Sequence, residues 1–216
     1  MKLTIILFGI FYSIVSQSVY AGSVVEEVPA DPDASEKYIF YLHGSVEESE
    51  GETDKYVTAV EAIAESSATV ISEVRGDTEP NIYAQKIKGY VEHLISKGVP
   101  AKNITVSGFS KGSIIALASS GVINNPDVNY VLLAGCSEFL NEKYSVDPAK
   151  AVGRILSIYD SGDGKFESCD GMISSSNKVK FEETELDSGK GHKLFRIPKG
   201  KFIEQWRDPL VEWAGA

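Results

Sequence analysis

Short apolar runs alternate along the chain with longer segments in which apolar residues recur every three to four positions. The runs predict buried strands, and the helical spacing predicts helices that pack one face on a core. Helices are expected at residues 53–67, 81–97 and 111–120, and a last one from Asp208-Pro209, because proline suits a first helical turn. Strands are expected at residues 38–43, 68–74, 103–107, 130–134, 155–159 and 178–186.

This alternation predicts the fold class. Strands rich in Ile, Val and Leu that alternate with amphipathic helices favour an α/β fold of about six mostly parallel strands, with helices on both faces. In such sheets ligands bind beyond the carboxyl ends of the strands. Functional side chains are therefore expected just after strands.

The first 37 residues do not follow this pattern. Lys2 precedes the apolar run LTIILFGIFYSIV and small residues up to Ala21, which is typical of a secretory signal peptide, residues 1–21. The run is short for a membrane span, so stable membrane insertion is not expected. Residues 22–37 are acidic and contain prolines, so we expect a linker, followed by one domain at 38–216. The mature protein is expected in the periplasm or outside the cell.

Charge and cysteine content narrow the possible partners. The net charge of −10 repels phosphate backbones, so nucleic-acid binding is not expected. The two cysteines, Cys136 and Cys169, are too few for a structural zinc site. In an exported protein such a pair favours a disulfide over two buried thiols, and both residues follow predicted strands. No metal or organic cofactor is implied.

The segment SGFSKGS at residues 107–113 contains a G-x-S-x-G pattern centred on Ser110. It lies between an apolar strand and an apolar helix, which is the context of a nucleophilic serine on a sharp strand-to-helix turn. The alternative is that Ser110 only caps the helix. A serine hydroxyl is a weak nucleophile, so a base is required.

The base and the acid are predicted from chain order, because in this arrangement the order is Ser, Asp or Glu, His. Of the three histidines only His192 follows Ser110; His43 and His93 precede it. Asp163, four residues past the end of the strand predicted at residues 155–159, is the expected acid, with Asp160 as the alternative.

The oxyanion of an acyl-transfer reaction needs hydrogen-bond donors. The backbone N–H of Lys111, next to the nucleophile, is one candidate, and the N–H of Ser45, in the sequence LHGS after the first predicted strand, is the other. The side chains of Arg75 and Lys111 are candidates for contact with an anionic substrate group, although ion pairing or solvation is the more common role of such residues.

The segments YLHGS, SGFSKGS, ILSIYDSGD and the late Gly191-His192 resemble the α/β-hydrolase superfamily, and more narrowly a group of small secreted bacterial α/β-hydrolases of undefined substrate. The similarity covers residues 38–214 and implies a triad of Ser110, Asp163 and His192. Residues 137–152 are too few for a large cap domain.

These observations predict a monomeric exported serine hydrolase of the carboxylesterase type. It would cleave a carboxylic ester or thioester, in a small molecule or on a polymer, through an acyl-enzyme. Two alternatives remain at this stage: a non-catalytic binding or scaffold protein on a hydrolase fold, and an acyltransferase that uses the same triad.

Overall fold

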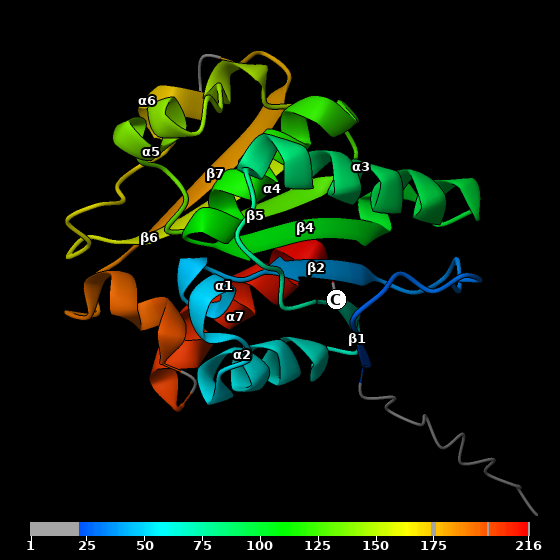
Figure 1. Ribbon diagram of the computed structural model, residues 1–216, viewed down its shortest axis with the longest axis horizontal. Coiled ribbons are helices and arrows are strands. Elements are labelled where there is room, and N and C mark those ends of the chain that lie inside the picture. The colour runs from blue at the N-terminus through cyan, green and yellow to red at the C-terminus, as the bar shows by residue number, and fades with distance from the viewer. Residues whose placement is uncertain (1–21, 174–175, 198, 216) are drawn as a thin grey trace, which may run out of the picture.

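The structure is a computed structural model that describes residues 22–173, 176–197 and 199–215 (Figure 1). The expected signal peptide, residues 1–21, lies outside the described residues. Among the described helices, none is long and apolar enough to cross a membrane.

A seven-stranded sheet forms the centre of the molecule, with the order β1-β3-β2-β4-β5-β6-β7, and each neighbouring pair is parallel. This confirms the expected α/β fold, and each of the six predicted strands is present. The strands are β1 (Val24–Val25), β2 (Tyr38–Leu42), β3 (Thr69–Ile71), β4 (Ile104–Phe109), β5 (Asn129–Leu133), β6 (Gly153–Asp160) and β7 (Val179–Leu186).

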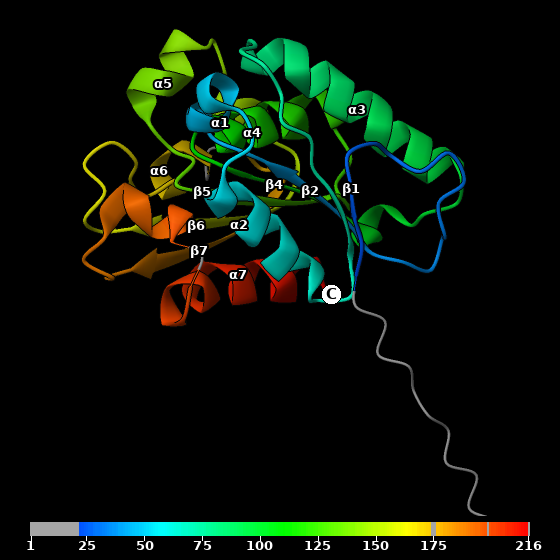
Figure 2. The same cartoon turned by 60° about the horizontal axis from the view of Figure 1, so that its bottom comes forward.

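Helices cover both faces of this sheet (Figures 1 and 2). The helices α3 and α4 pack together on one face, and α2 and α7 lie on the other. The helices are α1 (Ser45–Glu50), α2 (Asp54–Ala64), α3 (Pro80–Ser96), α4 (Lys111–Ile123), α5 (Glu138–Lys143), α6 (Asp170–Ile173) and α7 (Lys201–Ala214), and short 3-10 turns span residues 101–103, 148–150 and 191–196.

Local sequence explains where the longer helices begin and end. The side chain of Thr53 accepts a hydrogen bond from the backbone N–H of Tyr56 and so caps α2. Pro80 occupies the first position of α3, where its missing N–H has no cost. Gly98 follows α3 with φ of 95°, a conformation that glycine adopts without strain.

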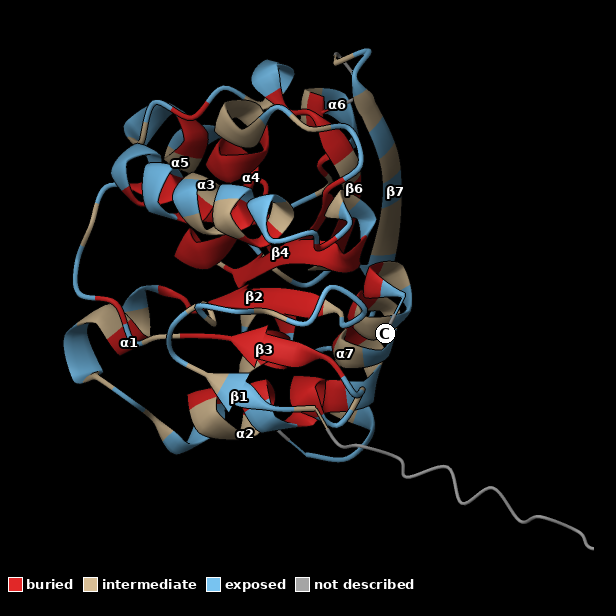
Figure 3. Cartoon of the chain, turned by 90° about the vertical axis from the view of Figure 1, so that its right-hand side faces the viewer, coloured by how far each residue is buried: buried red, intermediate tan, exposed pale blue. Residues whose placement is uncertain are grey.

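Burial across the sheet follows from its two helical layers. The residues of β2, β3 and β4 are buried throughout (Figure 3), and so are those of β5. The edge strand β7 instead has intermediate and exposed residues, which agrees with its partial alternation of apolar and polar side chains. The strands β2 and β4, which precede Ser45 and Ser110, are therefore held in the core.

Residues 22–37, expected to form a linker, include the seventh strand, which the sequence did not predict. Val24 and Val25 of β1 pair with Val70 and Ile71 of β3. The amide of Val70 donates to the carbonyl of Ser23 at 2.7 Å. This segment therefore extends the edge of the sheet, because even a short extended segment satisfies the exposed amides of an edge strand.

The start of the last helix also differs from the prediction. It begins at Lys201, and Pro209 lies inside α7. Ile203, Trp206 and Leu210 of this helix are buried. Their burial outweighs the one backbone hydrogen bond that proline cannot donate, so the apolar face sets the length of the helix.

No large cap domain covers the carboxyl edge of the sheet in the described part of the chain. The connection between β5 and β6 holds only α5 and the 3-10 turn at residues 148–150. This agrees with the expectation from its length.

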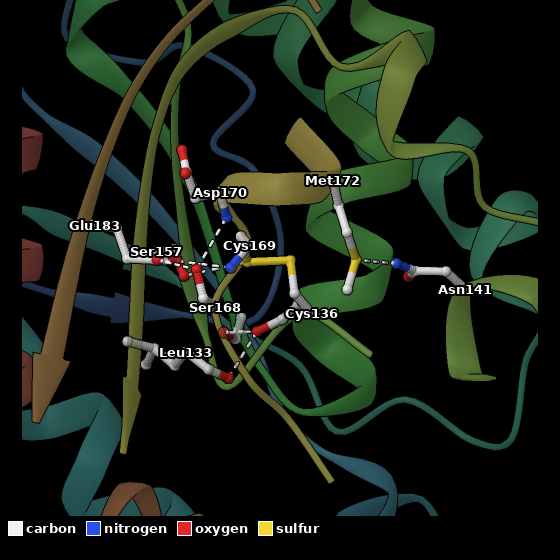
Figure 4. Close-up of a disulfide and its surroundings, with 11 residues drawn as sticks. Leu133, Cys136, Asn141, Ser157, Ser168, Cys169, Asp170, Met172 and Glu183 are labelled. Carbon is white, nitrogen blue, oxygen red and sulfur yellow. Dashed lines mark hydrogen bonds between the residues drawn. A yellow bond between two sulfur atoms is a disulfide. The ribbon is translucent and has the colours of Figure 1, made fainter. Parts of the chain in front are cut away.

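A disulfide joins Cys136 and Cys169, as predicted, with their Cα atoms 5.2 Å apart (Figure 4). Cys136 follows β5, and Cys169 ends the loop that follows β6. Glu167 in the same loop donates its N–H to the carbonyl of Cys136 at 3.1 Å. The carboxylate of Glu183 on β7 accepts from the N–H of Cys169 at 2.7 Å. The loop after β6 is thus fixed to both neighbouring strands.

Removal of this disulfide is expected to reduce stability. Its sequence separation of 33 residues corresponds to about 3–4 kcal/mol in the chain-entropy model. A Cys136→Ala/Cys169→Ala double variant should show this loss in urea unfolding under non-reducing conditions. Wild type unfolded in the presence of a reductant should match the variant; equal stability of the oxidised wild type and the variant would contradict the prediction.

Candidate active site

Four connections at the carboxyl edge of the sheet carry the predicted site residues. Ser110 follows β4, Asp163 follows β6 and His192 follows β7, while Ser45 comes shortly after β2. Because all these strands are parallel, their carboxyl ends meet at one edge, where ligands bind in open α/β sheets. Residues far apart in the sequence therefore lie close together.

Ser110 occupies a strained turn between β4 and α4. Its φ and ψ are 55° and −119°, a conformation that costs energy for any residue with a side chain. Two glycines make the turn possible. A Cβ on Gly108 would lie 2.3 Å from the carbonyl carbon of Gly112, and a Cβ on Gly112 would lie 1.9 Å from the carbonyl oxygen of Leu42. The G-x-S-x-G pattern is therefore required by the packing of this turn.

Ser110, His192 and Asp163 form one chain of hydrogen bonds. The Nε2 atom of His192 lies 3.1 Å from the Oγ of Ser110, and its Nδ1 lies 2.7 Å from Oδ2 of Asp163. A carboxylate only accepts, so Nδ1–H donates to Asp163 and Nε2 is left to accept the serine proton. This arrangement has the geometry of a nucleophile, a base and an orienting acid.

The two candidate acids have different surroundings. The Oδ1 of Asp163 accepts from the N–H groups of Lys165 and Phe166, which leaves Oδ2 for His192. Asp160 is fully buried and accepts from the backbone of Gly162, Ser188 and Gly191 and from the Ser188 hydroxyl.

These bonds explain the protonation state and the role of Asp160. Burial by itself would raise its pKa, but the hydrogen bonds from Ser188, Gly162 and Gly191 outweigh burial and hold the pKa below the ordinary value. Asp160 therefore ties the loop after β7 to the loop after β6. The structure brings Asp163, and not Asp160, to His192.

Two aromatic rings enclose the His192 imidazole, and the sequence analysis missed both. The ring of Phe166 stacks on the imidazole at a centroid distance of 4.7 Å and an angle of 10°. The ring of Phe109 lies at 4.8 Å on a tilt of 33°. Phe109 is the residue before Ser110, and Phe166 comes three residues after Asp163. Together they restrict the orientation of the imidazole.

The two predicted oxyanion donors open helices beside Ser110. Ser45 is the first residue of α1 and Lys111 the first of α4. Amides at such positions have no acceptor within the helix. A Cβ on Gly44 would lie 3.5 Å from the Cβ of Ser110, so the loop after β2 closely approaches the candidate nucleophile.

His43 supports this loop from behind, away from the triad. Its Nδ1 lies 2.7 Å from the Gly44 carbonyl, and its Nε2 accepts from the N–H of Arg75 at 2.9 Å. Burial, together with the charge of Arg75, lowers the pKa of His43 to about 4. His43 is therefore neutral at neutral pH and holds the loop in one conformation.

This lowered pKa makes stability depend on pH. The pKa of the unfolded state is near 6.5, so protonation favours unfolding as the pH falls from about 6.5 towards 4, and the effect disappears above this window. Between pH 7 and pH 5 the free energy of unfolding should fall by about 2 kcal/mol from His43 alone. In urea unfolding, a His43→Asn variant should lack this part of the fall in the free energy of unfolding. An identical fall in wild type and variant would show that His43 is not its source.

Arg75 does not line the cavity that contains Ser110, which removes support for the expected contact with substrate. Its Nε donates to Glu48 at 3.0 Å, and a terminal nitrogen donates to the carbonyl of His43.

The other oxygen of Glu48 accepts from Nζ of Lys111 at 2.8 Å, and Asp77 accepts from the same Nζ. Burial would lower the pKa of Lys111, but the hydrogen bonds to Asp77 and Glu48 raise it above the ordinary value. Arg75, Glu48 and Lys111 thus form a buried ion network, to which the exposed Asp77 is joined from the surface.

A cavity of about 690 Å³ opens over Ser110 and His192. Its wall combines apolar and basic side chains from five segments of the chain. The lining includes Ser45, Val46, Phe109, Lys111, Phe139, Leu140, Lys143, Tyr144, Lys165, Phe166, Lys193 and Arg196. The site is therefore accessible to a substrate of moderate size.

Comparison with known proteins gives a match over more than half of the chain. The family described as phospholipase/carboxylesterase matches residues 75–198 of the 216. The matched segment contains Ser110, Asp163 and His192, whereas Ser45 lies before it. No curated protein matches the sequence.

Solved structures of the same architecture come from distant organisms. The chain is similar to SOBER1 from Arabidopsis thaliana, with a TM-score of 0.50 and 15% identity over 82% of this chain and 100% of that one. It is similar to the RedJ thioesterase from Streptomyces coelicolor, with a TM-score of 0.54 and 11% identity over 96% and 97%. An esterase from Pyrobaculum calidifontis has a TM-score of 0.58 and 15% identity over 86% and 78%. At these identities the likeness shows a shared fold.

Proposed function

The chain belongs to the phospholipase/carboxylesterase family of α/β-hydrolases, and on this basis we propose that it is an exported serine hydrolase. Family membership and fold support a hydrolase of the esterase type. The proposal adds a serine mechanism, with an acyl-enzyme formed on Ser110 from a carboxylic ester or thioester.

One observation carries this mechanism: the hydrogen-bonded chain from Ser110 through His192 to Asp163 at the carboxyl edge of the sheet. The serine hydroxyl transfers its proton to Nε2 of His192 while Oγ attacks the substrate carbonyl. The N–H groups of Ser45 and Lys111 stabilise the negative charge on the carbonyl oxygen. His192 then gives the proton to the leaving oxygen or sulfur, and Asp163 holds the imidazole in the required tautomer.

Water completes the cycle on the same residues. His192 takes a proton from a water molecule, the hydroxide attacks the acyl carbonyl, and the proton returns to Oγ of Ser110 as the acid leaves. The open cavity of about 690 Å³ gives water access to the acyl group. Transfer of the acyl group to another acceptor would use the same steps with a different nucleophile.

Export and a monomeric state are also part of this proposal. The disulfide between Cys136 and Cys169 supports export, because such bonds persist in oxidising compartments. The hydrophobic start of the sequence supports cleavage near Ala21. The N-terminal residue of the mature protein from the native host, read by mass spectrometry, tests this part; retention of residues 1–21 would contradict it.

The acyl-enzyme is tested with para-nitrophenyl butanoate. We expect steady hydrolysis by the wild type and, after a rapid acid quench, a butanoyl group on the tryptic peptide that contains Ser110. Ser119→Ala, on the same helix α4 with its hydroxyl bonded to the Ile115 carbonyl, is the matched control and should keep the adduct. Hydrolysis without an adduct on this peptide would contradict an acyl-serine intermediate.

A further inference from the structure

Among the described residues, basic side chains and no acidic one line the cavity over Ser110. This is opposite to the chain as a whole, in which 31 acidic residues outnumber 21 basic ones. The charge of the lining is therefore a local property of the site. The basic residues are Lys111, Lys143, Lys165, Lys193 and Arg196.

Two of these five are paired with carboxylates that do not line the cavity. Lys111 is bonded to Glu48 and Asp77, and Arg196 lies 3.0 Å from Glu47. The other three, Lys143, Lys165 and Lys193, are exposed and form no ion pair within the described residues. We call these three the lysine rim. Their charge is available to a ligand in the cavity.

Helix α5 shows how the sequence separates the charges. Glu138 and Glu142 are four positions apart and so lie on one side of the helix, where they line a second hollow. Leu140 and Lys143 line the cavity over Ser110 instead. The same short helix thus presents its acidic residues away from the site and a lysine towards it.

The cavity also contains apolar surface that has no partner in the described part of the chain. Phe139 of α5 is 72% exposed and lines the cavity next to the half-buried Leu140. An apolar group in the substrate would cover these side chains and gain free energy from burial. The complementary ligand therefore has an apolar part next to an anionic group.

The position of the rim indicates which half of an ester carries the charge. Lys193 follows His192 directly, and Lys165 precedes Phe166, whose ring stacks on His192. In the mechanism proposed above, His192 protonates the leaving group, so the alcohol half of the ester lies on this side. Two of the three rim lysines are thus placed beside the alcohol half.

We propose that the substrates are esters whose alcohol half is apolar and carries an anionic group, which the lysine rim binds. This inference rests on the proposed serine-hydrolase function and adds a substrate class to it. Attraction by several charges at the mouth of a cavity also speeds the encounter with an anionic substrate.

A matched pair of esters tests the proposal: the butanoyl esters of meta-hydroxybenzoate and meta-hydroxybenzamide. They have the same acyl group and nearly the same shape, and differ by one negative charge in the leaving group. Each kcat/KM is divided by the rate constant for hydroxide-catalysed hydrolysis of the same ester. This division corrects the comparison for the difference in intrinsic reactivity between the two esters. The wild type should prefer the anionic ester by about tenfold or more, and the preference should fall as salt is raised.

Two triple variants with the same change in net charge distinguish the effect of the lysine rim from the effect of the protein's overall charge. In Lys143→Gln/Lys165→Gln/Lys193→Gln the preference should fall to near one. In Lys102→Gln/Lys150→Gln/Lys178→Gln it should be retained, because these lysines precede β4, β6 and β7 at the opposite edge of the sheet.

The outcomes distinguish the two proposals. If the wild type hydrolyses both esters at equal corrected rates, the proposed role of the lysine rim is wrong. The same holds if the rim variant keeps the preference of the wild type. In both cases the proposed serine-hydrolase function is unaffected. If both triple variants lose the preference equally, the proposed binding of the anionic group by the lysine rim is also contradicted. If the wild type hydrolyses neither ester and no other aryl ester, the proposed function is contradicted, and the inference is contradicted with it.

Discussion

The Asp163→Asn variant is expected to lose about four orders of magnitude in kcat for ester hydrolysis. Asp163 accepts the Nδ1–H of His192 at 2.7 Å, and its side chain is only 2% exposed. An amide at this position can donate to Nδ1 and so stabilise the tautomer with the proton on Nε2, which cannot accept the proton of Ser110. The measurement is steady-state kinetics on para-nitrophenyl butanoate, with circular dichroism to show that the variant is folded.

Asp160→Asn is the matched control, since it makes the same chemical change in the other candidate acid. The carboxylate of Asp160 accepts from four donors, and an amide leaves at least one of them without an acceptor. We expect kcat within about tenfold of wild type and a loss of about 2–4 kcal/mol in the free energy of unfolding. The opposite pattern, with activity lost in Asp160→Asn and kept in Asp163→Asn, would make Asp160 the acid.

The pH dependence of stability gives an independent check on Asp160. The pKa of Asp160 in the folded state is below the ordinary value of 3.8. Its ionised carboxylate therefore stabilises the folded state above about pH 3.8, and this stabilisation is lost as the pH falls through the folded pKa. The wild type should therefore lose stability in this acid range, and Asp160→Asn should lose less. This range lies below the window expected for His43, so the two contributions can be separated in one series of unfolding curves.

Ser110→Ala is expected to lower kcat by at least about 10⁴-fold. The substitution removes the only atom of the side chain that reaches His192, while the strained turn and both glycines remain. The same kinetic assay measures the effect, and Ser119→Ala on the same helix should stay close to wild type. A Ser110→Ala variant with more than a tenth of wild-type activity would contradict the assignment of the nucleophile.

Much of the fold was predictable because local pattern and tertiary structure agree. The apolar run at residues 38–42 is a strand because a buried parallel strand favours continuous apolar sequence. The prediction of Ser110 used the G-x-S-x-G pattern between a strand and a helix, and the prediction of His192 used chain order. The structure places these two side chains within hydrogen-bonding distance. Their catalytic roles remain predictions, which the variants above test.

Other features depend on tertiary contacts that the sequence does not display. The two residues of β1 form a strand only because β3 offers an unpaired edge. Helix α1 has the sequence SVEESE, with no apolar periodicity to mark it. The choice between Asp160 and Asp163 depends on which carboxylate the folded loop brings to His192, and a loop offset cannot decide this. Phe166 reaches His192 only through the fold of its loop.

The most direct test of the central claim is reaction of the folded protein with a fluorophosphonate probe, followed by peptide mapping. Such probes react with serines that a neighbouring base has activated. The account predicts one adduct, on Ser110, that is absent after heat denaturation and absent in Ser110→Ala but retained in Ser119→Ala. A folded wild type that shows no adduct, or an adduct on another serine, would contradict it.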